Sequence, residues 1–186
     1  MPMNKYLSAD EYKVIQTHLA AGDACLTISR SISRQFFMRV SDSSIKSNTG
    51  NSALPQKILV WACQACALLS LVICCGLIID SFGWWAALVV PVAGASWAIL
   101  AGFTNVNGGW RGITALLVGS IVSYSFLTEA YSLPLILFVF SLWAHRMTYI
   151  LAQILLIAIV KKSYAAYDML IENVEITDPM TPEPRK

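Results

Sequence analysis

The chain has 186 residues, of which 56% are hydrophobic and 13% are charged, whereas a soluble domain has about 25% charged residues. Its formal net charge is only +2, which argues against the strongly basic surface of a nucleic-acid-binding protein. Residues 58–160 contain only four charged side chains, and a bilayer core of about 30 Å needs about 20 apolar residues for each helix that crosses it. The composition therefore predicts an all-α membrane protein surrounded by the lipid bilayer.

The first element predicted along the chain is a helix in residues 1–40. Ser8 followed by Glu11 forms a capping box, and Gly22 suits the position just after the last helical turn. Asp23 is then the expected cap of a second helix, which completes the segment. We therefore expect residues 1–40 to form a cytoplasmic, amphipathic helical hairpin.

Two arrangements of the second helix are open, because its apolar residues lie on one side and Arg30 and Arg34 lie on another. It can lie on the anionic inner leaflet of the membrane, or the hairpin can pack on the cytoplasmic face of a transmembrane bundle. Residues 41–57 are predicted to be a linker because they are rich in serine and asparagine.

A bundle of four transmembrane helices is expected in residues 58–160. Polar and glycine-containing breaks divide this stretch into spans at about 58–79, 84–103, 112–127 and 133–160. Ser132 is the expected cap of the fourth span, and Pro134 is tolerated in a first helical turn. The fourth span is either one long helix or two half-helices. Residues 161–186 are predicted to extend it into the cytoplasm and to end in a disordered tail.

The orientation follows from the basic residues near the ends of the spans. Lys57, Arg111 and Lys161 lie beside the start of the bundle, in its middle loop and after its end, whereas the other two loops carry only Asp80 and Glu129. Both termini are therefore expected in the cytoplasm, and the protein in a bacterial inner membrane.

Each predicted span carries small residues at a spacing of three or four positions, which lets helices approach closely in lipid. Cys63 and Cys66 form a C-x-x-C pair, but inside an apolar helix we interpret these cysteines as small packing residues rather than as a redox or metal site. No cofactor or metal is expected. The main candidates for helix packing are Cys66, Ser70, Cys74, Gly94, Ala98, Gly102, Gly112 and Gly119.

The costliest residues in the apolar stretch are His145 and Arg146, because an arginine at the centre of a bilayer costs about 2.5–3.5 kcal/mol on insertion scales. If Lys161 marks the inner boundary, the helical rise places Arg146 in the outer half of the membrane. Two interpretations are open: a polar site within the membrane, or a structural clamp between Arg146 and an outer carboxylate. The residues of this candidate intramembrane site are His145, Arg146, Glu129, Asp80, Tyr149 and Gln153.

The sequence shows no carboxylate pair, histidine cluster or nucleophile–base pair at a spacing useful for catalysis, so we expect no enzyme activity. Small residues are plentiful and reactive groups are scarce, which favours an interaction protein that packs its helices on another integral membrane protein or on a second copy of itself. Such a protein is an accessory subunit or a blocking, immunity or exclusion-type factor. The alternative is a transporter of protons or of a small solute that uses His145, Arg146 and Glu129.

Overall fold

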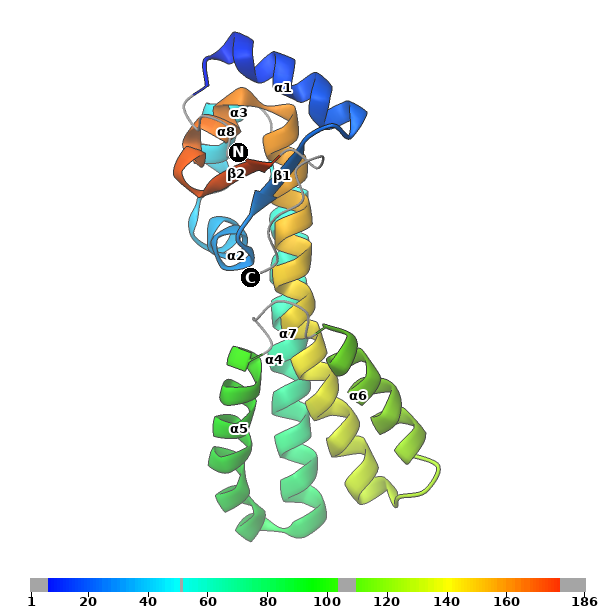
Figure 1. Ribbon diagram of the computed structural model, residues 1–186. Coiled ribbons are helices and arrows are strands. Elements are labelled where there is room, and N and C mark those ends of the chain that lie inside the picture. Colours follow the sequence, from blue (N-terminus) through cyan, green and yellow to red (C-terminus); the bar gives the residue numbers. More distant parts are fainter. Residues whose placement is uncertain (1–6, 51, 104–109, 178–186) are drawn as a thin grey trace. The chain divides into compact units, whose positions relative to one another are not determined.

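The computed structural model describes residues 7–50, 52–103 and 110–177. The chain divides into two compact units. We call the unit formed by residues 1–58 and 150–186 the polar unit, and the unit formed by residues 59–149 the apolar unit. Two long helices, α4 (Leu54–Phe82) and α7 (Glu129–Lys162), contribute to both (Figure 1).

The polar unit combines short helices with a two-stranded antiparallel sheet in which β1 pairs with β2. The predicted capping box is confirmed at the start of its first helix, because the Glu11 amide donates to Ser8 Oγ and the Ser8 amide donates to Glu11 Oε2. Gly22 ends that helix with a φ of 85°, a left-handed conformation that favours glycine. The elements are α1 (Ala9–Ala21), β1 (Cys25–Ile28), α2 (Arg30–Arg39), α3 (Asp42–Thr49), α8 (Tyr164–Met169), η2 (Ile171–Asn173) and β2 (Val174–Thr177).

The second helix is shorter than predicted, because residues that follow Asp23 form the strand β1 instead. Leu26 and Ile28 are each 2% exposed, while the alternate residues Cys25 and Thr27 face outward. This alternation suits a strand with one buried face. The pairing partner lies near the other end of the sequence, where Ile28 is opposite Val174. The fold is therefore mostly, not entirely, helical.

Part of the predicted linker is also helical. Ser41 caps α3 by accepting a hydrogen bond from the Ser44 amide, and Gly50 ends this helix with a φ of 74°. On the C-terminal side, the predicted continuous extension is interrupted, because α7 ends at Lys162 and Ser163 caps the separate helix α8. Most of the predicted tail, residues 178–186, lies outside the described residues.

The apolar unit holds helices with the length and composition of membrane spans. Among the described residues, three helical stretches qualify, namely Leu54–Phe82, Trp84–Ala101 and Glu129–Lys162. The second combines η1 (Trp84–Leu88) with α5 (Val89–Phe103). The remaining apolar helix, α6 (Trp110–Ser123), has 14 residues and rises only about 21 Å. The structure is compatible with membrane integration, and a fourth crossing stays a prediction.

One predicted break in the apolar unit is narrower in the structure, and the fourth predicted helix begins earlier than expected. The first turn lies at Gly83, whose φ is 79°, because α4 continues through Phe82. Ser132 is not a cap: α7 begins at Glu129 and continues past Pro134 as one helix. The missing amide of a proline in the second turn costs one hydrogen bond near the helix end, which the helix tolerates.

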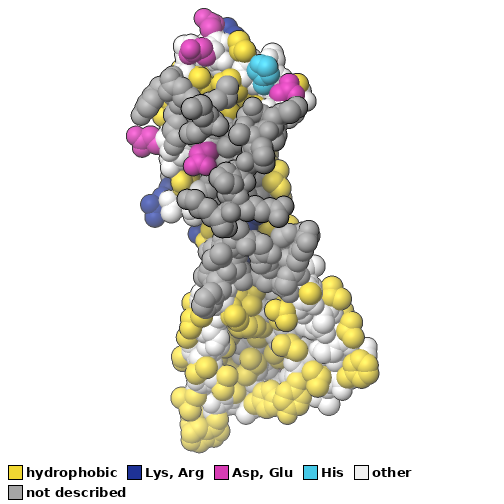
Figure 2. All heavy atoms as spheres, viewed as in Figure 1, with side chains coloured by type: hydrophobic (Ala, Val, Ile, Leu, Met, Phe, Trp, Pro, Cys, Tyr) yellow, Lys and Arg dark blue, Asp and Glu magenta, His cyan; other side chains and the backbone are white. Residues whose placement is uncertain are grey.

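The two units differ in the character of their surfaces. Figure 2 shows hydrophobic side chains gathered over the apolar unit, whereas acidic and basic side chains gather over the polar unit. Large aliphatic and aromatic side chains such as Val72, Leu88 and Val92 are more than half exposed. Such exposure is unfavourable in water and is expected in lipid.

Candidate functional site: the polar centre of the apolar unit

Three helices of the apolar unit meet at the side chain of Ser141. The Ser141 hydroxyl donates to the carbonyl oxygen of Ala67 on α4 at 2.6 Å, and it accepts from Trp97 Nε1 on α5 at 3.0 Å. Ser141 and Ala67 are fully buried. A buried indole N–H needs an acceptor when no water is present, so this pair of hydrogen bonds joins α5 to both long helices.

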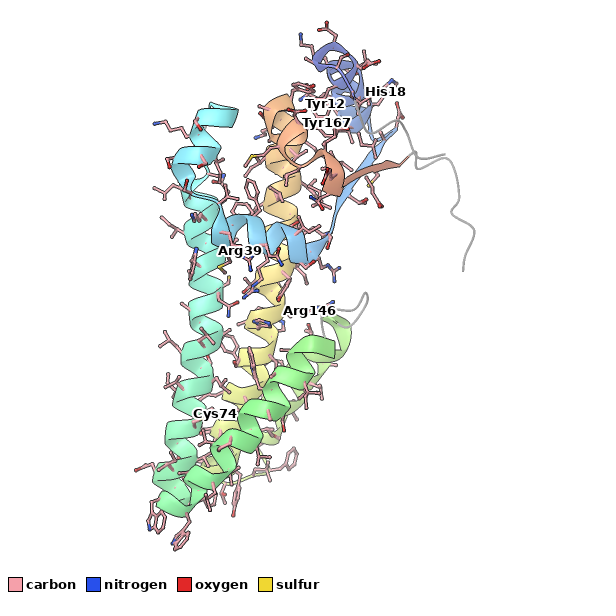
Figure 3. The ribbon with its side chains drawn as sticks, turned by 90° about the vertical axis from the view of Figure 1, so that its left-hand side faces the viewer. Tyr12, His18, Arg39, Cys74, Arg146 and Tyr167 are labelled. Atoms are coloured by element: carbon pink, nitrogen blue, oxygen red, sulfur yellow. The ribbon has the colours of Figure 1, made fainter. Side chains whose placement is uncertain are left out.

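A second contact between α4 and α7 fixes how these helices run past each other. The Cys74 thiol, which is 2% exposed, donates to the carbonyl oxygen of Pro134 at 3.1 Å. From the first contact to the second, the residue number rises on α4, from Ala67 to Cys74, and falls on α7, from Ser141 to Pro134. The two helices are therefore antiparallel. Figure 3 shows Cys74 where α4 and α7 lie side by side.

An aromatic contact extends this centre by one turn along α7. The His145 ring lies between Trp97 and Tyr149, with centroid distances of 4.9 Å and 5.3 Å in edge-to-face geometry. His145 is 8% exposed, and Thr148 is fully buried. The Thr148 hydroxyl donates to the Ala144 carbonyl within its own helix. The predicted association of His145 with Tyr149 is therefore present, and Trp97 completes it.

The predicted clamp is not formed. Arg146 is buried at 2% exposure, but Glu129 is the first residue of the same helix, and 17 residues of helix separate them by about 25 Å. Asp80 lies six residues beyond Cys74 on α4, and the antiparallel register places it at the same far end as Glu129. Both carboxylates are exposed. The charged residues that the sequence grouped thus lie at opposite ends of the apolar unit.

Gln153, also predicted for this site, belongs to the polar unit. Its side chain donates to the carbonyl oxygen of Ile28 and accepts from Arg30 Nε. The depth predicted for Arg146 rests on Lys161 as the membrane boundary. In the structure, however, residues from Ile150 onward are part of the polar unit. Arg146 is therefore near the end of the part of α7 that belongs to the apolar unit, four residues before the polar unit begins.

The predicted packing face of α4 is correct in part. Ser70 is 8% exposed and Cys74 is buried, but Cys66 is exposed and lies off the packed face. The face that packs within this chain is formed by Val60, Gln64, Ala67, Ser70 and Cys74. Their spacing of three and four residues is that of a helix packed against another at a shallow angle.

The small residues predicted on α5 and α6 are mostly uncovered. Ala98 and Gly119 are exposed, and a Cβ atom added at Gly94 or Gly119 would meet no other atom within 4 Å. These glycines therefore do not serve a close approach between helices of this chain. The surroundings of Gly102 and Gly112, the other two candidates on these helices, lie outside the described side chains.

Two grooves open on the surface of the apolar unit. One, of about 410 Å³, lies between α6 and α7, and its α6 wall includes Ala115, Gly119 and Ser123. The other, of about 640 Å³, lies between the end of α4, η1 and the start of α7 and is lined by large apolar side chains such as Trp85 and Phe138. Neither groove brings catalytic groups together, and within the described residues no three His, Cys, Asp or Glu side chains form a metal site.

Comparisons with protein-family models, with curated proteins and with solved structures found no match.

Trp97 is the residue of this centre that the sequence interpretation missed. The signal was present, because Trp97 lies within a predicted span rather than at one of its ends, where tryptophan usually marks the membrane interface. An indole N–H at that position requires an acceptor on a neighbouring helix, and Ser141 is the one it finds.

Proposed function

We propose that the chain is an integral membrane protein of a bacterial inner membrane that acts by binding a helix of another membrane protein, as an accessory subunit or a blocking, immunity or exclusion-type factor. The observation that carries this proposal is the groove between α6 and α7, whose α6 wall is a row of small residues at intervals of four: Ala115, Gly119 and Ser123. Such a row lets the backbone of a second helix approach closely.

The space at Gly119 supports an occupant from outside the chain. A glycine in a helix costs about 1 kcal/mol relative to alanine, and no described neighbour within this chain requires it here. Leu135 and Val139 of α7 form the opposite wall. A partner helix seated between the two walls would cover small residues on one side and aliphatic residues on the other.

The topology that goes with this proposal has α6 as a fourth, short crossing. Lys57, Arg111 and Lys161 then lie on one side of the membrane, and the positive-inside rule makes that side the cytoplasm. Both termini and the polar unit are cytoplasmic in this arrangement.

Transport by His145, Arg146 and Glu129 is less well supported. A shared site needs these side chains along one path, whereas Glu129 is about 25 Å from Arg146 along α7. We propose no catalytic role, since the polar centre around Ser141 holds hydrogen bonds that join helices rather than a nucleophile beside a base.

The test is a large residue in the groove. Gly119→Leu fits within the chain itself because the space beside Gly119 is open, so the protein should accumulate and stay folded. It should nevertheless lose its complex in mild detergent, measured by size-exclusion chromatography with light scattering and mass spectrometry of the co-eluting proteins. The matched control is Val118→Leu, which changes an exposed neighbour on the same helix.

The outcomes are distinct. A complex lost in Gly119→Leu and kept in Val118→Leu supports the proposal, and the mass shows whether the partner is another protein or a second copy. An unaltered complex in Gly119→Leu, or a monomer in the wild type, contradicts it.

A further inference from the structure

Helix α2 is fixed at its N-terminal end to α7. Gln153 Nε2 donates to the carbonyl oxygen of Ile28, two residues before α2, at 2.7 Å. Arg30, the first residue of α2, donates from Nε to Gln153 Oε1 at 3.1 Å. The side chain of one glutamine thus holds both the approach to the helix and its first turn.

The other end of α2 is fixed to α4. Lys57 Nζ donates to the carbonyl oxygen of Val40, the residue that ends α2, at 2.8 Å. In the sequence, Lys57 lies two residues before the apolar unit begins at Leu59, and Gln153 lies four residues after that unit ends at Tyr149. Within the polar unit, helix α2 is therefore attached at one end to α7 and at the other end to α4 (Figure 3).

The charge of α2 is entirely positive. It carries Arg30, Arg34 and Arg39 and no acidic residue. The nearest acidic residue in the sequence, Asp42, is already engaged, because its carboxylate accepts hydrogen bonds from the Ser52 hydroxyl and the Ala53 amide.

Two of these arginines form a pair along one flank of α2. Arg30 and Arg34 are one helical turn apart, so their side chains are neighbours, and both are partly buried. Ser33, Phe36 and Phe37 form the buried face of the helix beside them. Arg30 Nη1 is buried and makes no hydrogen bond to a described residue, so this guanidinium still has donor capacity.

We infer that Arg30 and Arg34 bind the phosphate group of an anionic phospholipid in the leaflet next to the polar unit. Guanidinium groups donate paired N–H bonds that match the oxygens of a phosphate. Both attachment residues, Lys57 and Gln153, lie within four residues of the apolar unit in the sequence, which favours a lipid headgroup over free phosphate. This site is separate from the α6–α7 groove, and its function does not depend on the partner proposed above.

The test uses the full-length protein in a neutral detergent and measures its thermal unfolding midpoint as lipid is added. Phosphatidylglycerol should raise the midpoint, whereas phosphatidylcholine and inorganic phosphate at the same concentration should not. In Arg34→Gln the apparent affinity for phosphatidylglycerol should fall about fivefold, since a basic side chain near an anionic membrane surface contributes on the order of 1 kcal/mol. Arg34→Lys should keep part of the effect.

Lys13→Gln is the matched control, because it removes the same charge from an exposed position on α1. A phosphatidylglycerol shift that is kept in Lys13→Gln and reduced in Arg34→Gln supports the inference. An equal shift in Arg34→Gln or with phosphatidylcholine overturns it, and an equal shift with inorganic phosphate shows a free-anion site instead. If Arg34→Gln does not fold, Arg34→Lys and Arg39→Gln give the same comparison, with the larger loss expected at Arg34.

Discussion

At the scale of single residues, the hydroxyl of Ser141 links three helices of the apolar unit through two hydrogen bonds. It donates to the backbone of α4 and accepts from the indole of α5 at the same time. Because the hydroxyl hydrogen is given to the Ala67 carbonyl, a lone pair of the oxygen is available to the Trp97 N–H. Each hydrogen bond polarises the hydroxyl in the direction that strengthens the other. Loss of this one atom leaves the partly buried Trp97 indole N–H without its acceptor, whereas the Ala67 carbonyl keeps its hydrogen bond within α4.

Replacement of Ser141 by alanine is therefore expected to lower the free energy of unfolding by about 1 kcal/mol, the usual size of a hydrogen bond between membrane helices. Trp97→Phe removes one of the same bonds, so the double variant should lose less than the sum of the two single variants. Unfolding in mixed micelles with increasing sodium dodecyl sulfate measures all three. Ser96→Ala, at an exposed position of α5, is the control, and equal losses in Ser96→Ala and Ser141→Ala would contradict the assigned bonds.

The burial of Tyr12 leads us to expect that the stability of the polar unit depends on pH. It is fully buried, its hydroxyl donates to the Val160 carbonyl at 2.6 Å, and burial raises its pKa to about 12. The folded protein therefore holds this proton more tightly than the unfolded chain, whose tyrosine pKa is about 10. Stability from Tyr12 is complete below pH 10 and is lost as the pH rises through about 12.

Tyr12→Phe should reduce that alkaline loss of stability, and at pH 7 it should cost on the order of 1 kcal/mol for the missing hydrogen bond. Thermal unfolding followed by circular dichroism between pH 8 and pH 12 gives both values. Tyr167 stacks on Tyr12 and also has a raised pKa because of burial, so a smaller alkaline loss should persist. A variant with the same alkaline decline as the wild type would exclude Tyr12 as its source.

At the scale of elements, local signals were sufficient where the stabilising contact is local. The capping box of Ser8 and Glu11 could be predicted because its partners are three residues apart. Strand β1 could not be predicted in this way, because its four residues from Cys25 onward need a hydrogen-bonded partner strand. That partner is β2, which begins 146 residues after Ile28. A short apolar run next to an expected helix cap fits a helix equally well until that partner is known.

The register of the two strands can be tested by cross-linking. Thr27 is directly opposite Glu175, and both are exposed, so cysteines at these two positions should form a disulfide on mild oxidation. The experiment is done with Cys25 replaced by serine, and the product is detected as a faster band on a non-reducing gel. Thr27→Cys with Glu172→Cys, outside the strand, is the control. Equal oxidation of the control pair would show that the disulfide forms by random collision of mobile segments and does not depend on the register of β1 and β2.

At the scale of the whole molecule, the predicted grouping around Arg146 depends on where the membrane-spanning part of α7 ends. The sequence predicts one span over residues 133–160, since the sequence from Ile150 to Val160 is as apolar as the sequence before it. In the structure this second part belongs to the polar unit: Tyr12 bonds to Val160, and Gln16 bonds to Lys161. Hydropathy cannot distinguish a helix buried in lipid from one buried in protein, and the depth predicted for Arg146 depends on that distinction.

A membrane boundary at Tyr149, where the apolar unit ends, leads to a prediction for α7. Residues 129–149 would cross the bilayer, and 21 residues rise about 31 Å, which matches a hydrocarbon core of about 30 Å. Ile154 is 60% exposed and would lie outside that core. In a cysteine-free background, Ile154→Cys should react with a membrane-impermeant maleimide added from the cytoplasmic side, in inverted membrane vesicles. Leu135→Cys, also partly exposed in the structure at 41%, should stay unlabelled from either side because lipid covers it. If Ile154→Cys is shielded as well, residues 150–160 lie in the membrane, and the original interpretation of the span, with Arg146 in the outer half, is correct.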